Sequence, residues 1–169
     1  IPTTLSSGKD NLVLARFSLN GVGQWLISGG TGDDELPKAV AMTDDRIYLS
    51  YRAKNATVTW YGPTGTSLGS NTAATSKKEM RVSAFSLTPA HIWTTALLED
   101  DDSFSTGPAG LAAGCNALYI TSITHSPCTF PGVGVINTGT QELFYLGRIN
   151  PANGQFQWVT AGTTTGANH

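Results

Sequence analysis

The residues with the clearest capacity for chemistry are acidic, and they occur in three short clusters. They are Asp33-Asp34-Glu35, Asp44-Asp45 and Glu99-Asp100-Asp101-Asp102. Clustered carboxylates can bind Ca²⁺, which takes about six to eight oxygen ligands. None of the clusters has the ligand spacing of an EF-hand, and aspartates at turns commonly bond the local backbone instead. We therefore interpret the clusters as turn residues, with a metal site at Asp100, Asp101 and Asp102 as the weaker alternative.

The other residue types typical of active sites are present without the spacing that catalysis needs. His91 lies at a predicted hairpin turn, His125 in a predicted loop, and His169 is the last residue, so no zinc ligand set is formed. The one Gly-x-Ser-x-Gly match, residues 65–69, lies in a predicted polar loop without a following helix, so it does not predict the nucleophile elbow of serine hydrolases. Residues 62–66 are rich in glycine but lack the lysine of a phosphate-binding loop. The sequence therefore predicts no enzyme and no cofactor.

Aromatic residues in two long loops are the candidates for ligand binding. Trp60 and Tyr61 lie in the first loop, and Phe130 lies at the matching place in the second. An exposed aromatic ring could stack on a pyranose, because its face is apolar and broad. Glycan binding through Trp60, Tyr61 or Phe130 is therefore one alternative for function.

Composition favours a turn-rich β protein of 169 residues and 17.7 kDa, because charged residues make up only 13% of it and glycine is abundant. The net charge of −2 argues against a nucleic-acid partner. No apolar run is long enough to span a membrane. The chain starts at Ile1-Pro2, so we expect a processed protein or a piece of a longer one. Low charge with much Thr, Ser and Gly is typical of an extracellular or virion-surface protein.

The two cysteines leave several alternatives open. Cys115 and Cys128 bracket a predicted strand, which would hold them roughly 20 Å apart. A disulfide would need the following loop to fold back, since the two Cα atoms must come within about 7 Å. Two thiols and a metal site are the other possibilities. Residues 55–57 form a glycosylation sequon, although so short a match arises easily by chance.

A repeat is the strongest signal for the fold. Three segments that combine a β-rich run, a turn and a second β-like run end at Trp25, Trp93 and Trp158, which lie 68 and 65 residues apart. A second landmark recurs at Tyr48 and Tyr119, 71 residues apart. Recurrence at a nearly fixed spacing is the signature of a repeat architecture.

Each full repeat contains four predicted strands: one of small residues, one with the tyrosine, one that alternates in polarity, and one with the tryptophan. Two long polar loops, residues 53–78 and 124–141, interrupt the full repeats. The predicted strands are residues 12–18, 24–28, 38–42, 46–52, 80–87, 92–96, 110–114, 117–123, 143–149 and 156–160.

Four-stranded antiparallel sheets repeated along a chain predict an all-β fold made of β-propeller blades. Strands near a propeller axis need small side chains, which residues 38–42 and 110–114 supply. The tryptophans would lie on outer strands and form the core between neighbouring blades. We divide the single propeller segment of residues 1–169 into an outer half-blade (1–30), two blades (38–98 and 107–162) and the start of a connection (163–169).

The motif order also resembles the SBBP-type β-propeller repeats. The first repeat carries it as Thr4-Leu5-Ser6-Ser7-Gly8, Asn20-Gly21, Trp25, and Gly29-Gly30-Thr31-Gly32-Asp33-Asp34. In the second repeat, residues 97–102 replace the glycine motif, and the third repeat ends without an acidic pair. The resemblance covers most of the chain, implies the propeller fold, and carries over no catalytic residues.

Two and a half blades make an incomplete ring, because propellers typically close with about four to eight. We therefore predict that the inner edge of residues 12–18 pairs with a strand outside these 169 residues. A longer parent chain is the favoured source, and a homo-oligomeric ring is the alternative.

For function, the sequence predicts a non-enzymatic propeller module for surface interaction or structural assembly, with protein or glycan partners bound through the long loops. A lectin-like propeller and a fragment of a larger enzyme are the alternatives.

Overall fold

The computed structural model describes residues 11–54, 57–72, 78–99, 110–114, 116–124, 127–136 and 143–163. In this part of the chain there are fourteen strands and no helix, so the all-β class is confirmed. No helix here is long and apolar enough to cross a membrane. Several residues named in the sequence predictions lie outside the described residues. They are residues 55–56, Asp100, Asp101, Asp102, Cys115, His125 and His169.

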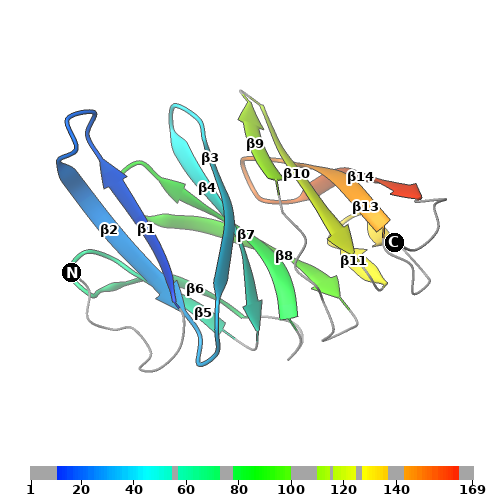
Figure 1. Ribbon diagram of the computed structural model, residues 1–169, viewed down its shortest axis with the longest axis horizontal. Coiled ribbons are helices and arrows are strands. Elements are labelled where there is room, and N and C mark those ends of the chain that lie inside the picture. Colours follow the sequence, from blue (N-terminus) through cyan, green and yellow to red (C-terminus); the bar gives the residue numbers. More distant parts are fainter. Residues whose placement is uncertain are drawn as a thin grey trace, which may run out of the picture.

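The strands form three repeated units, which lie side by side in chain order in Figure 1. The first unit is the hairpin β1 (Leu12–Phe17) and β2 (Gly23–Gly30). The second unit is an antiparallel sheet of β3 (Leu36–Met42), β4 (Arg46–Lys54), β7 (Lys78–Ser86) and β8 (His91–Glu99). The third unit is the same arrangement of β9 (Gly110–Gly114), β10 (Ala117–Thr124), β13 (Leu143–Ile149) and β14 (Phe156–Thr163). The four-strand order predicted for each full repeat is confirmed.

The prediction of two long polar loops is wrong, because each contains a hairpin. The first inserted hairpin is β5 (Thr57–Tyr61) and β6 (Ser67–Thr72), and the second is β11 (Cys128–Phe130) and β12 (Gly134–Ile136). Neither pairs with a strand of the unit that it interrupts. Instead β5 pairs with β2 and β11 pairs with β8, so each hairpin extends the sheet of the preceding unit.

The two inserted hairpins join their neighbours in the same register. Thr59 of β5 pairs with Gly30, which lies five residues after Trp25. Thr129 of β11 pairs with Leu98, which lies five residues after Trp93. The pairing of an inserted hairpin with the last strand of the preceding unit is therefore a repeated feature of this fold.

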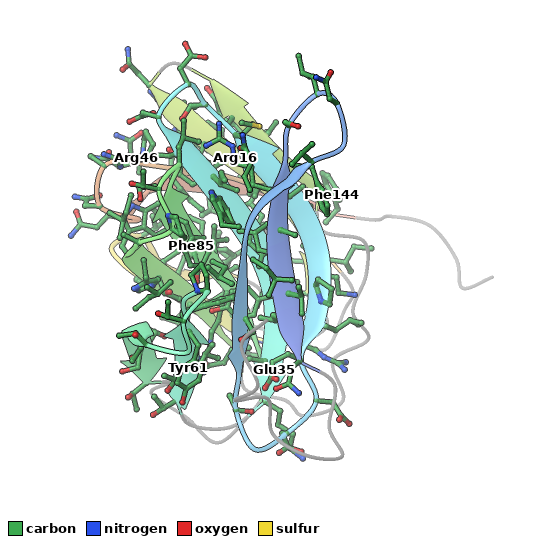
Figure 2. All side chains as sticks on the ribbon, turned by 90° about the vertical axis from the view of Figure 1, so that its left-hand side faces the viewer. Arg16, Glu35, Arg46, Tyr61, Phe85 and Phe144 are labelled. Atoms are coloured by element: carbon green, nitrogen blue, oxygen red, sulfur yellow. The ribbon has the colours of Figure 1, made fainter. Side chains whose placement is uncertain are left out.

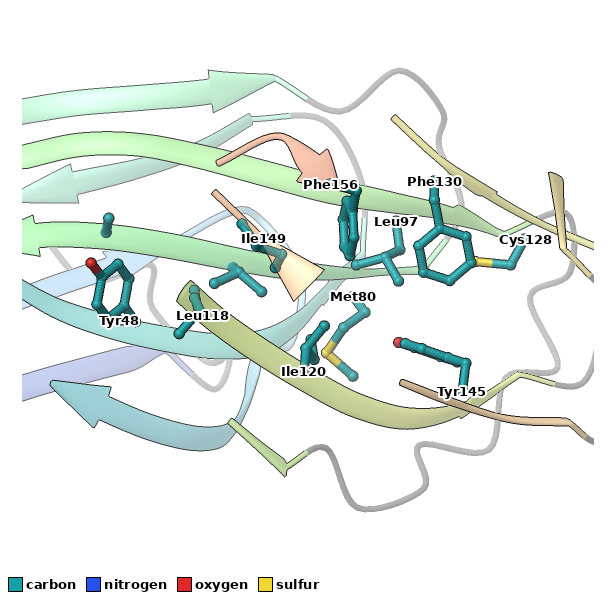
Figure 3. Packing of buried hydrophobic residues seen from close by; sticks show 12 residues of the cluster. Tyr48, Met80, Leu97, Leu118, Ile120, Cys128, Phe130, Tyr145, Ile149 and Phe156 are labelled. Carbon is teal, nitrogen blue, oxygen red and sulfur yellow. The ribbon is translucent and has the colours of Figure 1, made fainter. Parts of the chain in front are cut away.

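Two hydrophobic cores fill the spaces between the units. The larger lies between the second and third units and includes Tyr48, Met80, Leu97, Phe130 and Phe156, all buried (Figure 3). The smaller lies between the first and second units and is built from Leu12, Ile27, Leu49, Tyr51, Ala53, Val58, Trp60 and Phe85. Each core takes side chains from an inserted hairpin, so the hairpins stabilise the stacking of units as well as their sheets.

The strands of small residues allow a close approach between units. β3 and β9 lie near each other, and Ala41, Leu111 and Ala113 pack against the larger core. At the other end of the row, β1 is the edge strand of its sheet, and no described strand pairs with its free edge. The matching edge pairs with an inner strand in the other two units: β7 pairs with β4 in the second unit, and β13 pairs with β10 in the third.

Candidate interaction surface

The three aromatic residues predicted to bind a ligand do not form a common platform. Trp60 and Phe130 have no exposed surface, because each inserted hairpin places its aromatic ring in the core beside it. The rings of Tyr51 and Phe85 meet Trp60 edge to face, with centroids 5.6 and 4.8 Å away. Neither buried ring presents a face to a sugar. Tyr61 is half-buried at the lower end of the molecule in Figure 2 and retains exposed surface.

The first acidic cluster holds one buried carboxyl group. Glu35 is buried, and the backbone N–H of Thr31 donates to its Oε1 at 2.9 Å, with a second bond from the Thr31 hydroxyl. Burial raises the pKa of Glu35, and the nearby Asp34 and Asp33 add to the rise, while the bonds from Thr31 oppose it. Within the described ranges, no three His, Cys, Asp or Glu side chains lie close enough together to hold a metal ion.

The single described histidine of the predicted set belongs to the packing between strands. The Nε2 of His91 lies 2.8 Å from the hydroxyl of Thr94, and its ring meets Phe85 edge to face at 5.7 Å. Burial lowers the pKa of His91. These contacts give His91 a structural role in the second unit.

One row of side chains across each sheet repeats through the whole fold. Cross-strand partners share a face of a sheet, so the members of a row lie side by side. In both full units the row reads alanine, tyrosine, a variable residue and tryptophan, and the described residues of the first unit supply the last two positions. The rows are Arg16–Trp25, Ala41–Tyr48–Ala84–Trp93 and Ala112–Tyr119–Arg148–Trp158. The three tryptophans therefore occupy equivalent positions in the strand register, as predicted.

The tryptophans of the first two rows contact the next unit in the same way, each beside an arginine, which is Arg16 of the row in the first unit and Arg46 at the start of β4 in the second. The indole N–H of Trp25 donates to the carbonyl of Leu87 at 3.0 Å, and Arg16 Nη1 donates to the same oxygen at 3.1 Å. The indole N–H of Trp93 donates to the carbonyl of Pro151 at 3.0 Å, and Arg46 also donates to that oxygen. At both interfaces one tryptophan and one arginine thus hold a turn carbonyl of the following unit.

The third row lies on a face that is open to solvent. Tyr119 is 37% exposed, whereas its equivalent Tyr48 is 1% exposed. Trp158 and Phe144 on the same face are 38% and 50% exposed. We call the four residues Tyr119, Phe144, Arg148 and Trp158 the tail face. The prediction that all three tryptophans form core between units is wrong for Trp158, because no described strand packs on this face.

The first unit exposes apolar residues at the opposite end of the row of units. Phe17 is 62% exposed, whereas Phe85 and Ile149, which lie at the same register position next to the strand irregularity, are buried. Val13, Ala15 and Leu26 accompany Phe17, and we call these four residues the head face. A hollow of about 440 Å³ lies on this face, lined in part by Ala15, Phe17, Leu26 and Pro63.

Sequence reasoning missed the residues that distinguish the two end faces. Arg16 and Arg148 hold the same place in their rows, but Arg16 lies nine residues before its tryptophan and Arg148 lies ten. The turn after β13 is one residue longer than the others, which hides the match. Aligning the segments on the bulge, in place of the tryptophan, would have revealed it.

No protein-family model, curated protein or solved structure matches this chain.

Proposed function

We propose that the chain is a non-enzymatic module of the β-propeller type, which acts in surface interaction or structural assembly. The observation that carries this proposal is the tail face, an exposed copy of a surface that is covered by the following unit elsewhere in the same chain. A surface of this kind is suited to contact with another protein unit.

The chemistry of the tail face supports the proposal. Contiguous exposed apolar surface commonly marks a site of interaction. Tryptophan, tyrosine and arginine are the residues that most often carry the energy of a protein interface, and the tail face has one of each in a single row.

The propeller interpretation adds a geometric reason for such a face. Blades arranged around an axis each cover one face of the next, and an incomplete set leaves one face bare at each end. The resemblance to SBBP-type repeats and an extracellular or virion-surface location belong to the same proposal. Both predict that the role of the chain is to present surfaces, without catalysis.

Site-specific photo-crosslinking tests the proposal. A photoreactive amino acid at Phe144, in the tail face, should form adducts in the cells that produce the protein. The same group at Val135, which is 57% exposed on the second inserted hairpin, is the matched control. Adducts from position 144 well above those from position 135 are expected. Equal yields would show that the tail face is not an interaction surface.

Glycan binding is the second candidate, because Tyr61 keeps exposed surface next to the turn of the first inserted hairpin. A glycan array probed with the purified chain and with the Tyr61→Ala variant tests it. Binding that is lost in the variant would support a lectin-like role. A blank array with the unmodified chain would exclude that role for the glycans on the array.

A further inference from the structure

We propose that copies of this chain associate head to tail, with the tail face of one copy packed on the head face of the next. This inference rests on the proposed function and names the partner of the tail face as a second copy. The two ends of one chain carry equivalents of the tryptophan and the turn carbonyl that meet at both of its internal interfaces.

The tail face carries the equivalents of Arg16 and Trp25, which donate to the turn carbonyl at the first internal interface. Arg148 pairs with Trp158 across β13 and β14, just as Arg16 pairs with Trp25 across β1 and β2, and a register shift follows the arginine in both. In the first unit both side chains donate to one carbonyl oxygen. The tail face therefore holds the same pair of residues in the same cross-strand position.

The head of the chain carries the equivalent of the turn that accepts these bonds. The carbonyl that accepts from Trp25 belongs to Leu87, two residues after Phe85, and Leu19 lies two residues after the equivalent Phe17. The two turns are closed by matching bonds, from Ser18 N to Val22 O and from Ser86 N to Ala90 O. Leu19 thus holds the same sequence position on its turn as Leu87 does on the turn of the second unit.

The apolar parts of the two end faces support the same pairing. Phe17 and Leu19 are exposed at the head, and Phe144 and Trp158 are exposed at the tail. At the internal interfaces the equivalents of Phe17 are fully buried. Removing these surfaces from water is the main driving force that we expect for association.

The incomplete first unit does not prevent this contact. Within the chain, the hairpin of β1 and β2 already packs against the second unit through Leu12, Ile27 and Trp25, without inner strands of its own in the described part. The head face lies on the other side of the same two strands. A second copy therefore needs to meet only these strands and their turn.

A head-to-tail contact between identical chains leaves one free face at each end. Such an interface can add further copies. The assembly is a closed ring when the rotation that relates neighbouring copies returns to the first copy, and a fibre when it does not. We therefore expect growth of the mean mass with concentration, beyond that of a dimer.

Sedimentation equilibrium of the purified chain over a wide concentration range tests the inference. The mean mass should rise above 17.7 kDa as the concentration increases. Phe17→Lys at the head and Trp158→Lys at the tail should each weaken self-association at least about tenfold. Val135→Lys should associate like the unmodified chain, because its site is similarly exposed and lies outside both end faces. Circular dichroism would confirm that each variant keeps its β structure.

A mixture of the two defective variants gives the decisive result. The Phe17→Lys chain keeps an intact tail face, and the Trp158→Lys chain keeps an intact head face. Mixed together, they should form a one-to-one dimer that grows no further. Self-association that survives either single substitution, or a mixture that stays monomeric while the unmodified chain associates, would overturn the head-to-tail arrangement.

A chain that is monomeric at all concentrations would also overturn the inference. If position 144 still formed crosslinks to other proteins in the producing cells, the proposed function would stand without it. If position 144 formed none, both would fail.

Discussion

Replacing Trp60 with alanine should destabilise the fold strongly and should leave any ligand binding of the folded protein intact. Trp60 is buried between β2 and the second unit, where its ring meets Tyr51 and Phe85 edge to face. It also lies against the backbone of Gly29, so close that a Cβ atom there would fall 2.3 Å from the ring. The alanine variant would leave a cavity at the junction of three structural pieces.

The size of the effect follows from the area that the ring buries. A fully buried tryptophan removes about 150–250 Å² from water, which corresponds to roughly 4–6 kcal/mol at about 25 cal/mol per Å². Measured losses for aromatic residues truncated to alanine in a core are about 3–5 kcal/mol. For a chain of this size, such a loss should lower the melting temperature by roughly 6–20 °C.

Urea unfolding followed by far-ultraviolet circular dichroism measures the loss without depending on tryptophan fluorescence. Tyr61→Ala is the matched control, since it changes the next residue of the same strand at a partly exposed site. We expect the control to cost about 1 kcal/mol or less. A Trp60→Ala variant as stable as the control would refute the core assignment, and a stable variant that had lost glycan binding would identify Trp60 as a ligand platform.

Three further substitutions test other parts of the packing. Gly29→Ala should cost about 1–3 kcal/mol and alter the near-ultraviolet dichroism, because the new methyl group meets Trp60; an unchanged melting temperature would contradict this contact. Glu35→Gln should flatten the dependence of stability on pH: burial raises the pKa of Glu35 above 4.5 in the folded state, so its contribution is greatest below that value and falls as the pH rises through the folded pKa. Stability of the variant and the unmodified chain should be compared by urea unfolding between pH 4 and pH 8, and parallel curves would contradict the prediction. Glu79→Gln should cost about 3–5 kcal/mol in urea unfolding, because it leaves the fully buried Arg81 without the carboxylate 3.2 Å away, whereas Glu79→Leu with Arg81→Met should recover most of the loss.

The strands of the repeated units could be predicted from the sequence because their signals are local. Alternating polarity, turn residues and the recurring tryptophans and tyrosines lie within windows of about a dozen residues. Residues 110–114 and 143–149 have the bounds that the pattern predicts. Others, such as β8, extend the predicted strand by a few residues.

The inserted hairpins could have been recognised as hairpins, but their partners could not. Residues 57–61 alternate in polarity and precede a turn closed by the bond from Gly65 N to Gly62 O, which is a local hairpin signal. The pairing of β5 with β2 depends on an edge about thirty residues earlier, which no local pattern encodes. For the same reason the burial of Trp60 followed from a contact that the sequence alone does not show.

The end faces illustrate a different limit of sequence reasoning. Trp25, Trp93 and Trp158 are equivalent in sequence and in register, yet only the first two are covered by a following unit. Burial depends on what lies on the other side of a surface. A repeat can therefore be predicted correctly while the exposure of its outermost member is predicted wrongly.

The inserted hairpins also impose an order on the folding of a chain made from its N-terminus. The sheet that begins with β1 and β2 gains its third and fourth strands only after residue 72 has been synthesised, by which time half of the second unit already exists. The sheet of the second unit likewise gains β11 and β12 only after β10. The first and second units thus complete their hydrogen bonding only when part of the next unit has been made. Release of a truncated chain would expose the edge of the last finished sheet, where unpaired strands are prone to aggregation.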